Sequence, residues 1–155
     1  MHLPHLRPFD SHSVVFLTVC VHQRRSLLAC DTAHEILRAL WAKSAELNGW
    51  YVGQYLLMPD HVHLFASSSP DARPLADWMR IWKSMGATRI NQSLRRTGTF
   101  WQADYFDRFI RSLDDYAEKW AYVALNPVRK GLVVNPENWP HRGMIHDLRY
   151  HVARS

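Results

Sequence analysis

The sequence lacks several features that define large classes of protein. Its longest apolar run, Val14 to Val21, spans eight residues and includes a threonine, whereas a transmembrane helix needs roughly 20 apolar residues. The two cysteines, Cys20 and Cys30, have no Cys-x-x-Cys spacing, which argues against a disulfide scaffold or a zinc finger. No basic segment followed by an apolar segment opens the chain, so we expect a cytoplasmic protein with reduced thiols.

Glycine and proline are also scarce, with six and eight residues, while 47% of the 155 residues are hydrophobic. This composition excludes a largely disordered chain and predicts one globular domain over residues 1–155, with a core at about 13–140 and a tail at 141–155. The chain is basic, because 19 Lys and Arg against 14 Asp and Glu give a formal charge of +5. Such a charge suits a polyanionic partner, and nucleic acid is the first candidate.

Apolar periodicity predicts a series of strands and helices. The Pro59-Asp60 turn should join two strands as a hairpin, and Thr32 with Glu35 has the spacing of a helix capping box. The expected strands are Ser13 to Val21, Trp50 to Met58, His61 to Ala66 and Phe100 to Ile110. The expected helices run from Thr32 to Asn48, from Pro74 to about Asn91, and from Ser112 to a residue before Pro127.

The resulting order, β-α-β-β-α-β-α, indicates the α+β fold class. It predicts a ferredoxin-like or RRM-like plait, with an antiparallel four-stranded sheet, helices packed on it and an added C-terminal helix. Segment 91–98 is polar and basic and is expected to be a loop or a frayed helix end. Segment 131–155 is expected to be an irregular cover.

The strongest local signal is the pair His61 and His63 inside an apolar strand. Residues two apart on a strand project from one face, so both imidazoles point together while Val62 and Leu64 take the other face. Two adjacent imidazoles suit Mn, Fe, Ni or Zn, and also Mg when phosphate oxygens and water complete the coordination shell. The alternative is a pair of ordinary half-buried histidines, because short motifs have high false-positive rates.

A second signal, Tyr122 and Asn126, lies at the end of the last expected helix. Residues four apart share one face of a helix, so the Tyr122 hydroxyl and the Asn126 amide can address one small site. A tyrosine can act as a nucleophile, and an asparagine carbonyl oxygen is a suitable third metal ligand beside two histidines. The alternative is a core tyrosine followed by a C-capping asparagine, which is the commoner case for an isolated Tyr-x-x-x-Asn.

Two long blocks of sequence resemble one known family. The blocks are YLLMPDHVHLF at residues 55–65 and YVALNPVRKGLV at residues 122–133, and the chain containing them resembles the REP-associated tyrosine transposases. These are single-tyrosine HUH transposases related to those of small insertion sequences. Phe100-Trp101-Gln102 and Trp139-Pro140 also look like family blocks, so the resemblance covers about Ser13 to Pro140. Position 60 is Asp where many relatives have Asn, which adds a carboxylate near the histidines.

This resemblance implies a DNA-binding transposase and endonuclease that cleaves and rejoins single-stranded DNA near hairpins. It implies that His61, His63 and Asn126 bind a divalent metal ion, Mg²⁺ or Mn²⁺, and that Tyr122 forms a 5′-phosphotyrosine intermediate. In relatives the recognised DNA is an imperfect palindromic hairpin with a short single-stranded guide. We expect a monomer, with a dimer as the alternative.

Basic residues that could contact DNA phosphates gather from position 80 onward. Exposed aromatic residues, such as Trp101 or Tyr105, could stack on unpaired bases. The alternative for each basic residue is an ordinary solvated surface. The candidate phosphate contacts are Arg80, Lys83, Arg89, Arg95, Arg96, Arg108, Arg111, Arg129 and Lys130.

Two other functions remain open at this point. One is a metal-dependent hydrolase in which the histidine pair activates water, although the strand itself offers no further close ligand. The other is an RRM-like nucleic-acid-binding module without catalysis, although the aromatic and glycine-bearing RRM block is absent. If Tyr122 is not the nucleophile, Tyr116 and Tyr105 are the next candidates.

Overall fold

A computed structural model describes residues 13–151 of the chain. The strands are β1 (Val14–Cys20), β2 (Trp50–Met58), β3 (His61–Ser68), β4 (Phe106–Ile110) and β5 (Arg142–Met144). The α-helices are α1 (Asp31–Asn48), α2 (Leu75–Leu94), α3 (Leu113–Ala124) and α4 (Asn126–Arg129). Three short 3-10 turns are η1 (His22–Arg24), η2 (Pro136–Asn138) and η3 (Leu148–His151).

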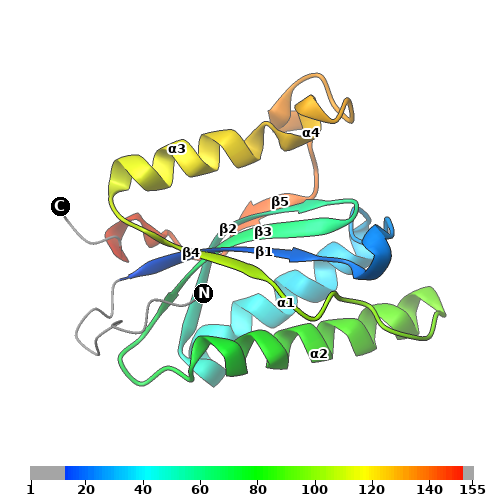
Figure 1. Ribbon diagram of the computed structural model, residues 1–155, viewed down its shortest axis with the longest axis horizontal. Coiled ribbons are helices and arrows are strands. Elements are labelled where there is room, and N and C mark those ends of the chain that lie inside the picture. The colour runs from blue at the N-terminus through cyan, green and yellow to red at the C-terminus, as the bar shows by residue number, and fades with distance from the viewer. Residues whose placement is uncertain (1–12, 152–155) are drawn as a thin grey trace.

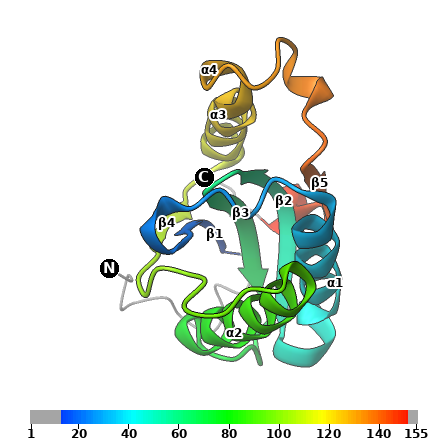
Figure 2. The same ribbon diagram turned by 90° about the vertical axis from the view of Figure 1, so that its right-hand side faces the viewer.

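The strands form one antiparallel sheet in the order β4-β1-β3-β2-β5. Helices α1 and α2 cover one face of this sheet, and α3 with α4 lies over the other face (Figure 1). Figure 2 shows the sheet from its end, between the two groups of helices. This arrangement confirms the predicted α+β class, although the sheet has five strands where four were expected. Over residues 13–151, the helices are all too short or too polar to cross a membrane.

β1 lies inside the sheet between β4 and β3, and most of its side chains are buried on both faces. Val15, Leu17 and Val19 belong to the core cluster that contains the apolar residues of α1 and α2. Val14 and Phe16 belong to a second cluster, which contains the buried residues of α3. The nearly continuous apolar sequence of β1 therefore reflects a strand with no solvent-exposed face, as predicted.

β2 and β3 form the predicted hairpin. Their pairing brings Met58 opposite His61, so Pro59 and Asp60 are the two residues of the turn. β1 pairs with the other edge of β3, which puts Thr18 opposite His63 and Cys20 opposite His61. The start of β3 is thus held between two strands.

Tryptophans fill the space between the sheet and the helices α1 and α2. The Trp41 and Trp82 rings meet edge-on with their centroids 5.4 Å apart, and Trp50 stacks on Trp78 at 5.0 Å. The indole nitrogen of Trp78 donates to Ser44 Oγ at 3.0 Å, which satisfies a polar group that would otherwise be buried without a partner. This core makes the α1–α2 layer the more firmly packed side of the sheet.

Both long helices have ends that differ from the predicted ones. α1 begins at Asp31 after Cys30, which makes no side-chain capping bond, so Thr32 lies within the first turn and the expected capping box is absent. α2 continues through Leu94 because Ile90 is fully buried and anchors its last turns. It ends at Arg95, which takes a left-handed φ of 53°.

The fourth strand is shorter than predicted. β4 starts at Phe106, opposite Thr18 of β1, whereas the residues before it join the sheet only through an isolated bridge between Trp101 and Val21. Phe100 and Trp101 are 2% and 6% exposed. Both of these neighbouring side chains pack into the core, so the segment does not alternate as a strand does.

The predicted last helix is divided into two. α3 ends at Ala124, Leu125 separates the helices, and α4 begins at Asn126. Pro127 lies in the first turn of α4, where a missing N–H is tolerated because those amides have no intrahelical partner. The long helix therefore stops before Pro127 as predicted, but a second short helix follows at once.

The segment expected to be an irregular cover contains the fifth strand. β5 pairs with β2 and brings Arg142 opposite Leu56. Just before β5, the Trp139 indole nitrogen donates to the Leu57 carbonyl at 2.9 Å, and the Leu57 amide donates to the His141 carbonyl at 2.8 Å. Residues 152–155 of the expected tail lie outside the described residues.

Candidate active site

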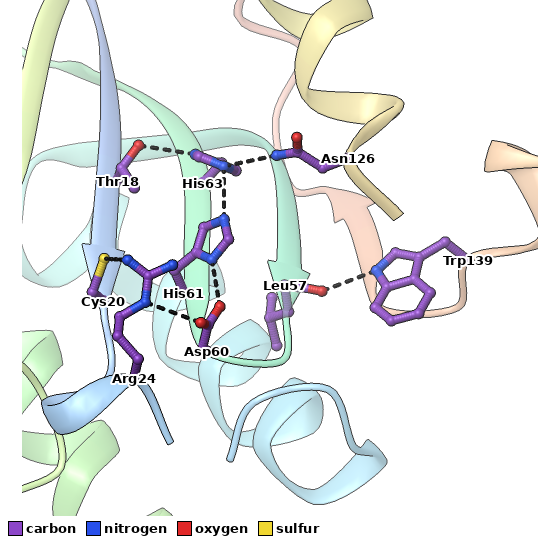
Figure 3. A network of polar contacts seen from close by, with 9 residues as sticks. All are labelled: Thr18, Cys20, Arg24, Leu57, Asp60, His61, His63, Asn126 and Trp139. Atoms are coloured by element: carbon purple, nitrogen blue, oxygen red, sulfur yellow. Dashed lines mark hydrogen bonds and ion pairs between the residues drawn. The ribbon is translucent and has the colours of Figure 1, made fainter. Parts of the chain in front are cut away.

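His61 and His63 lie at the start of β3 on the face that α3 covers. Val62 and Leu64 point into the opposite core, which confirms the predicted alternation along the strand. The two imidazole rings meet edge-on, and their Nε2 atoms are 3.1 Å apart (Figure 3). The histidine pair therefore presents two ring nitrogens to one small space.

Both Nδ1 atoms have oxygen partners on neighbouring residues. Asp60 Oδ1 lies 2.7 Å from His61 Nδ1, and Thr18 Oγ1 lies 2.9 Å from His63 Nδ1. Although burial alone would raise the pKa of Asp60, hydrogen bonds from His61 and Arg24 lower it, so this group is a carboxylate and only accepts. His61 therefore carries its proton on Nδ1 and keeps a lone pair on Nε2. His63 Nε2 lies 3.0 Å from Nδ2 of Asn126, which can only donate, so His63 also carries its proton on Nδ1, toward Thr18 Oγ1.

Both imidazoles are neutral at physiological pH. The pKa of His63 is lowered to about 3, mainly by burial and in smaller part by electrostatic interaction with His61, Lys119 and Arg129. Burial also lowers the pKa of His61, although Asp60 opposes this shift. Neutral imidazole is the form that binds a metal ion, so the site is prepared for coordination without losing a proton first.

Asn126 reaches the histidines from the α3–α4 layer. Its Nδ2 lies 3.0 Å from His63 Nε2, and its Oδ1 accepts a hydrogen bond from Arg129 (Figure 3 shows the contact with His63). A half-turn of the amide about its last bond exchanges the oxygen and the nitrogen; it turns the carbonyl oxygen toward the histidines and gives up the hydrogen bond from Arg129. The fold thus brings together all three residues that were predicted as metal ligands.

The spacing of these three groups fits a divalent cation. Ligand atoms that lie about 2.1 Å from a metal ion and at right angles to each other are roughly 3.0 Å apart. The separations here are 3.1 Å between the two Nε2 atoms and 3.0 Å between His63 Nε2 and the Asn126 amide. Between residues 13 and 151, no group of three or more His, Cys, Asp or Glu side chains could hold a metal ion. Asn126 is therefore the candidate for a third protein ligand beside the histidines.

Tyr122 lies one helical turn before Asn126, near the end of α3. Its side chain is 63% exposed, which leaves it accessible to a large substrate. The Arg129 guanidinium covers its ring at 4.0 Å from the centroid and also donates to the Tyr122 carbonyl oxygen at 2.7 Å. Because Arg129 donates to Asn126 as well, one arginine connects the candidate nucleophile to the candidate ligand.

The two other candidate tyrosines lie in different surroundings. Tyr116 is 4% exposed, stacks on Phe65 and donates its hydroxyl hydrogen to Gln54 at 2.9 Å. Burial raises the pKa of Tyr116 to about 12, so it is a poor nucleophile. Tyr105 packs against the core on the opposite side of the sheet, and burial raises its pKa as well. Tyr122 is therefore the tyrosine with the most suitable position.

Seven of the nine predicted phosphate contacts fall into two groups on opposite faces of the sheet. Arg129 and Lys130 lie at α4 on the histidine face, and the charge of Lys130 acts on His61. A second group belongs to α2 or directly follows it, on the other face of the sheet (Figure 2). This group consists of Arg80, Lys83, Arg89, Arg95 and Arg96.

Some of these residues also bind acidic side chains of the protein. Arg108, on β4, forms an ion pair with Asp115 at 2.6 Å, and the backbone amide of Arg111 donates to the same carboxylate. Arg80 pairs with Asp77 on the surface of α2. An exposed pair such as Arg80–Asp77 contributes little to stability.

Trp101 belongs to the protein interior, which corrects the expectation that it stacks on bases, and Lys83 is partly buried beside it. The Trp101 side chain is 6% exposed, and its indole nitrogen donates to the Lys83 carbonyl at 2.9 Å. The Lys83 ammonium donates to the carbonyl oxygens of Gln102 and Ala103, and burial lowers its pKa. These bonds attach the segment after α2 to the helix, and they use the ammonium group of Lys83 as the donor.

Three residues near the histidines were missed by sequence reasoning. Thr18 lies on the same face of β1 as Phe16, so strand alternation combined with the β1–β3 register would have placed it opposite His63. No sequence pattern indicated that Arg24 and Lys119 lie near the histidines, because their positions depend on how distant segments fold together. Arg24 contacts Asp60 in the hairpin turn, and Lys119 lies 5.1 Å from the Phe16 ring centroid.

Comparison with known proteins identifies the family. The profile of the family described as "Transposase IS200 like" matches residues 11–118. The chain therefore belongs to the IS200-like transposase family, which confirms the resemblance inferred from the two sequence blocks. The matched region contains the histidine pair and ends before Tyr122 and Asn126, so the roles of these two residues depend on their geometry.

Individual relatives extend this comparison. The chain is 27% identical over 130 residues to a REP-associated tyrosine transposase of Escherichia coli (strain K12), covering 81% of this chain and 72% of that protein. It is 22% identical over 152 residues to a candidate REP-associated tyrosine transposase of Haemophilus influenzae, covering 92% and 86%. A solved REP-associated tyrosine transposase bound to a REP hairpin has the same fold, with a TM-score of 0.69 and 22% identity over 85% of this chain and 76% of that one.

Proposed function

We propose that this transposase cleaves and rejoins single-stranded DNA near a hairpin, with Tyr122 as the nucleophile and a divalent cation as the cofactor. One observation carries the proposal: the Nε2 atoms of His61 and His63 converge with Asn126, one helical turn from an exposed tyrosine. Membership of the IS200-like family supports the general activity, and the hairpin bound to the solved relative supports the type of DNA.

In the proposed reaction, the Tyr122 oxygen attacks the scissile phosphorus and the phenol proton passes to water. The bond between phosphorus and the 3′ oxygen breaks, and that oxygen takes up a proton and leaves as a 3′-hydroxyl. The 5′ phosphate stays on Tyr122, so a 3′-hydroxyl of the same or another strand can reverse the step without ATP. Mg²⁺ or Mn²⁺ held by His61, His63 and Asn126 would neutralise charge that develops on the phosphate oxygens.

Positive charge around the site supports binding of the DNA backbone there. Lys119 Nζ lies 6.0 Å from the Tyr122 ring centroid, and the Arg129 guanidinium lies on the same ring. Lys130 follows α4 and acts on His61. Because each lysine or arginine that neutralises a phosphate releases counterions, these three residues draw the scissile strand toward the histidines.

Replacement of the nucleophile is the direct test. Tyr122→Phe should abolish the covalent adduct with a labelled hairpin oligonucleotide in Mn²⁺, seen on a denaturing gel, while DNA binding on a native gel stays. The matched control is Tyr116→Phe, which removes a hydroxyl that contacts Gln54 and should keep the adduct. An adduct formed by Tyr122→Phe would show that another residue attacks the phosphate.

The same gels separate this proposal from the two alternatives. A metal-dependent hydrolase would release cleaved DNA without any adduct, and chelation by EDTA would stop the cleavage. A nucleic-acid-binding module would shift the hairpin on a native gel and leave it uncut with every metal ion tested. Either outcome with the wild-type protein would contradict the phosphotyrosine mechanism.

The basic surface of α2 is proposed to hold a further part of the DNA. Residues 80–96 contain five Lys and Arg and no acidic residue, and α2 borders a groove of about 460 Å³ that Arg80 and Lys83 help to line. The combined change Arg89, Arg95 and Arg96 to Gln should weaken hairpin binding and reduce the salt slope of log K by up to about 3. Lys43→Gln on α1 is the control, and an equal effect of Lys43→Gln would contradict a role of α2.

A further inference from the structure

The segment between β1 and α1 lies against the hairpin turn that carries the histidines. The Val21 amide donates to the Asp60 carbonyl at 2.9 Å, and the Leu28 amide donates to the Pro59 carbonyl at 3.0 Å. The turn is therefore held from outside the hairpin at both of its residues. The connection between these two contacts contains η1 and includes Arg24.

Two residues of this connection have an unusual backbone. Gln23 and Arg24 take left-handed φ values of 56° and 54°, a region that residues with a Cβ rarely occupy. Such a backbone persists only where its surroundings favour it strongly, and it is concentrated at functional sites. Here the left-handed turn directs the Arg24 side chain toward Asp60.

The contacts of Arg24 lead directly to the candidate metal site. Its Nε donates to Asp60 Oδ2 at 2.9 Å, and its Nη1 lies 3.5 Å from Cys20 Sγ (Figure 3). The other oxygen of Asp60, Oδ1, accepts from His61 Nδ1 at 2.7 Å. Arg24 and His61 thus bind different oxygens of one carboxylate, which fixes its rotation.

We propose that Arg24 and Asp60 form a positioning pair that keeps the Nε2 lone pair of His61 available to a metal ion; this inference rests on the proposed metal site. Without an acceptor at Nδ1, the proton of His61 can move to Nε2. Because the Nε2 atoms of the two histidines are 3.1 Å apart, an Nε2–H of His61 would donate to His63 and close the site. The Asp60 carboxylate disfavours that closed arrangement, and Arg24 keeps the carboxylate in place.

This role differs from a contribution to folding. The Arg24 and Asp60 side chains are 53% and 28% exposed, and an ion pair at that exposure adds little to stability. Loss of an outer hydrogen-bond partner of a ligating histidine typically reduces metal affinity by about 10- to 100-fold. Substitution should therefore change metal binding while the melting temperature stays near the wild-type value.

The first test uses the full-length protein without metal. Nitrogen NMR of ¹⁵N-labelled histidine side chains reports which ring nitrogen of His61 carries the proton. We expect Nδ1–H in the wild type, a shift toward Nε2–H in Asp60→Ala, and a return toward Nδ1–H in Asp60→Asn, whose amide oxygen can still accept. An unchanged Nδ1–H signal in Asp60→Ala would overturn the proposal.

The second test measures Mn²⁺ affinity by titration calorimetry. Asp60→Ala should weaken it by about 10- to 100-fold and Arg24→Ala by a smaller factor, up to about 10-fold. Arg25→Ala is the matched control, because the Arg25 side chain donates a hydrogen bond to Gln23 at 3.3 Å and not to Asp60. This variant should bind Mn²⁺ as the wild type does. Equal losses in Arg24→Ala and Arg25→Ala would refute a specific role of Arg24. A wild type that binds no Mn²⁺ would contradict the proposed cofactor, and the NMR result would still decide the tautomer.

Discussion

Acidification should destabilise the metal-free protein through His63. Burial lowers the pKa of this imidazole from its ordinary value of 6.5 to about 3. Below pH 6.5 the unfolded chain takes up a proton at His63 and the folded chain does not, so stability falls as the pH falls toward 3. Between pH 7 and pH 5 this difference amounts to about 2 kcal/mol of unfolding free energy, a large fraction of the roughly 5–15 kcal/mol that stabilises a typical domain.

Urea unfolding followed by tryptophan fluorescence measures this change, with EDTA present to remove metal ions. Burial also lowers the pKa values of His61, His34 and His141. The wild type should therefore lose more unfolding free energy between pH 7 and pH 5 than His63 alone accounts for. His63→Gln isolates the contribution of His63, because this variant should lose about 2 kcal/mol less unfolding free energy than the wild type between pH 7 and pH 5. Equal losses in His63→Gln and the wild type would refute the assignment.

Two further predictions concern contacts near the site and at the sheet edge. Thr18→Val removes the oxygen that faces His63 Nδ1 at nearly constant shape, so it should destabilise the metal-free protein by about 1–3 kcal/mol in urea, whereas Thr18→Ser should cost less. Equal stability of Thr18→Val and Thr18→Ser would show that the Thr18 hydroxyl is unimportant. Gly143→Ala would place a Cβ 2.5 Å from Tyr55 Oη, so it should displace β5 and lower the melting temperature, and an unchanged melting temperature would contradict this packing.

The centre of the sheet could be predicted from sequence because its signals are local. A strand with both faces buried has a nearly continuous apolar sequence, and β1 shows one. The Pro59-Asp60 turn and the alternation around His61 and His63 predicted the hairpin and the common direction of the two rings. Each of these inferences uses residues within one element or two adjacent elements, where geometry follows directly from spacing.

The parts that could not be predicted depend on contacts between distant segments. β5 has three residues and becomes a strand because Arg142 and Met144 pair with the free edge of β2, far away in the sequence. The segment at Phe100 and Trp101 has strand-like composition, yet its aromatic side chains are buried beside α2. The contact between Arg24 and Asp60 depends on a left-handed turn that no pattern in the sequence indicates.

The two halves of the candidate site differ in how firmly the fold holds them. The histidines lie on β3, which has β1 on one side and β2 on the other, with a core behind them. Tyr122 and Asn126 lie on the α3–α4 layer, and the buried residues of α3 are Tyr116 and Val123. Segments with few buried apolar contacts open at the lowest free-energy cost. The layer that carries the candidate nucleophile is thus the one best able to adjust to a DNA strand, while the histidines stay fixed.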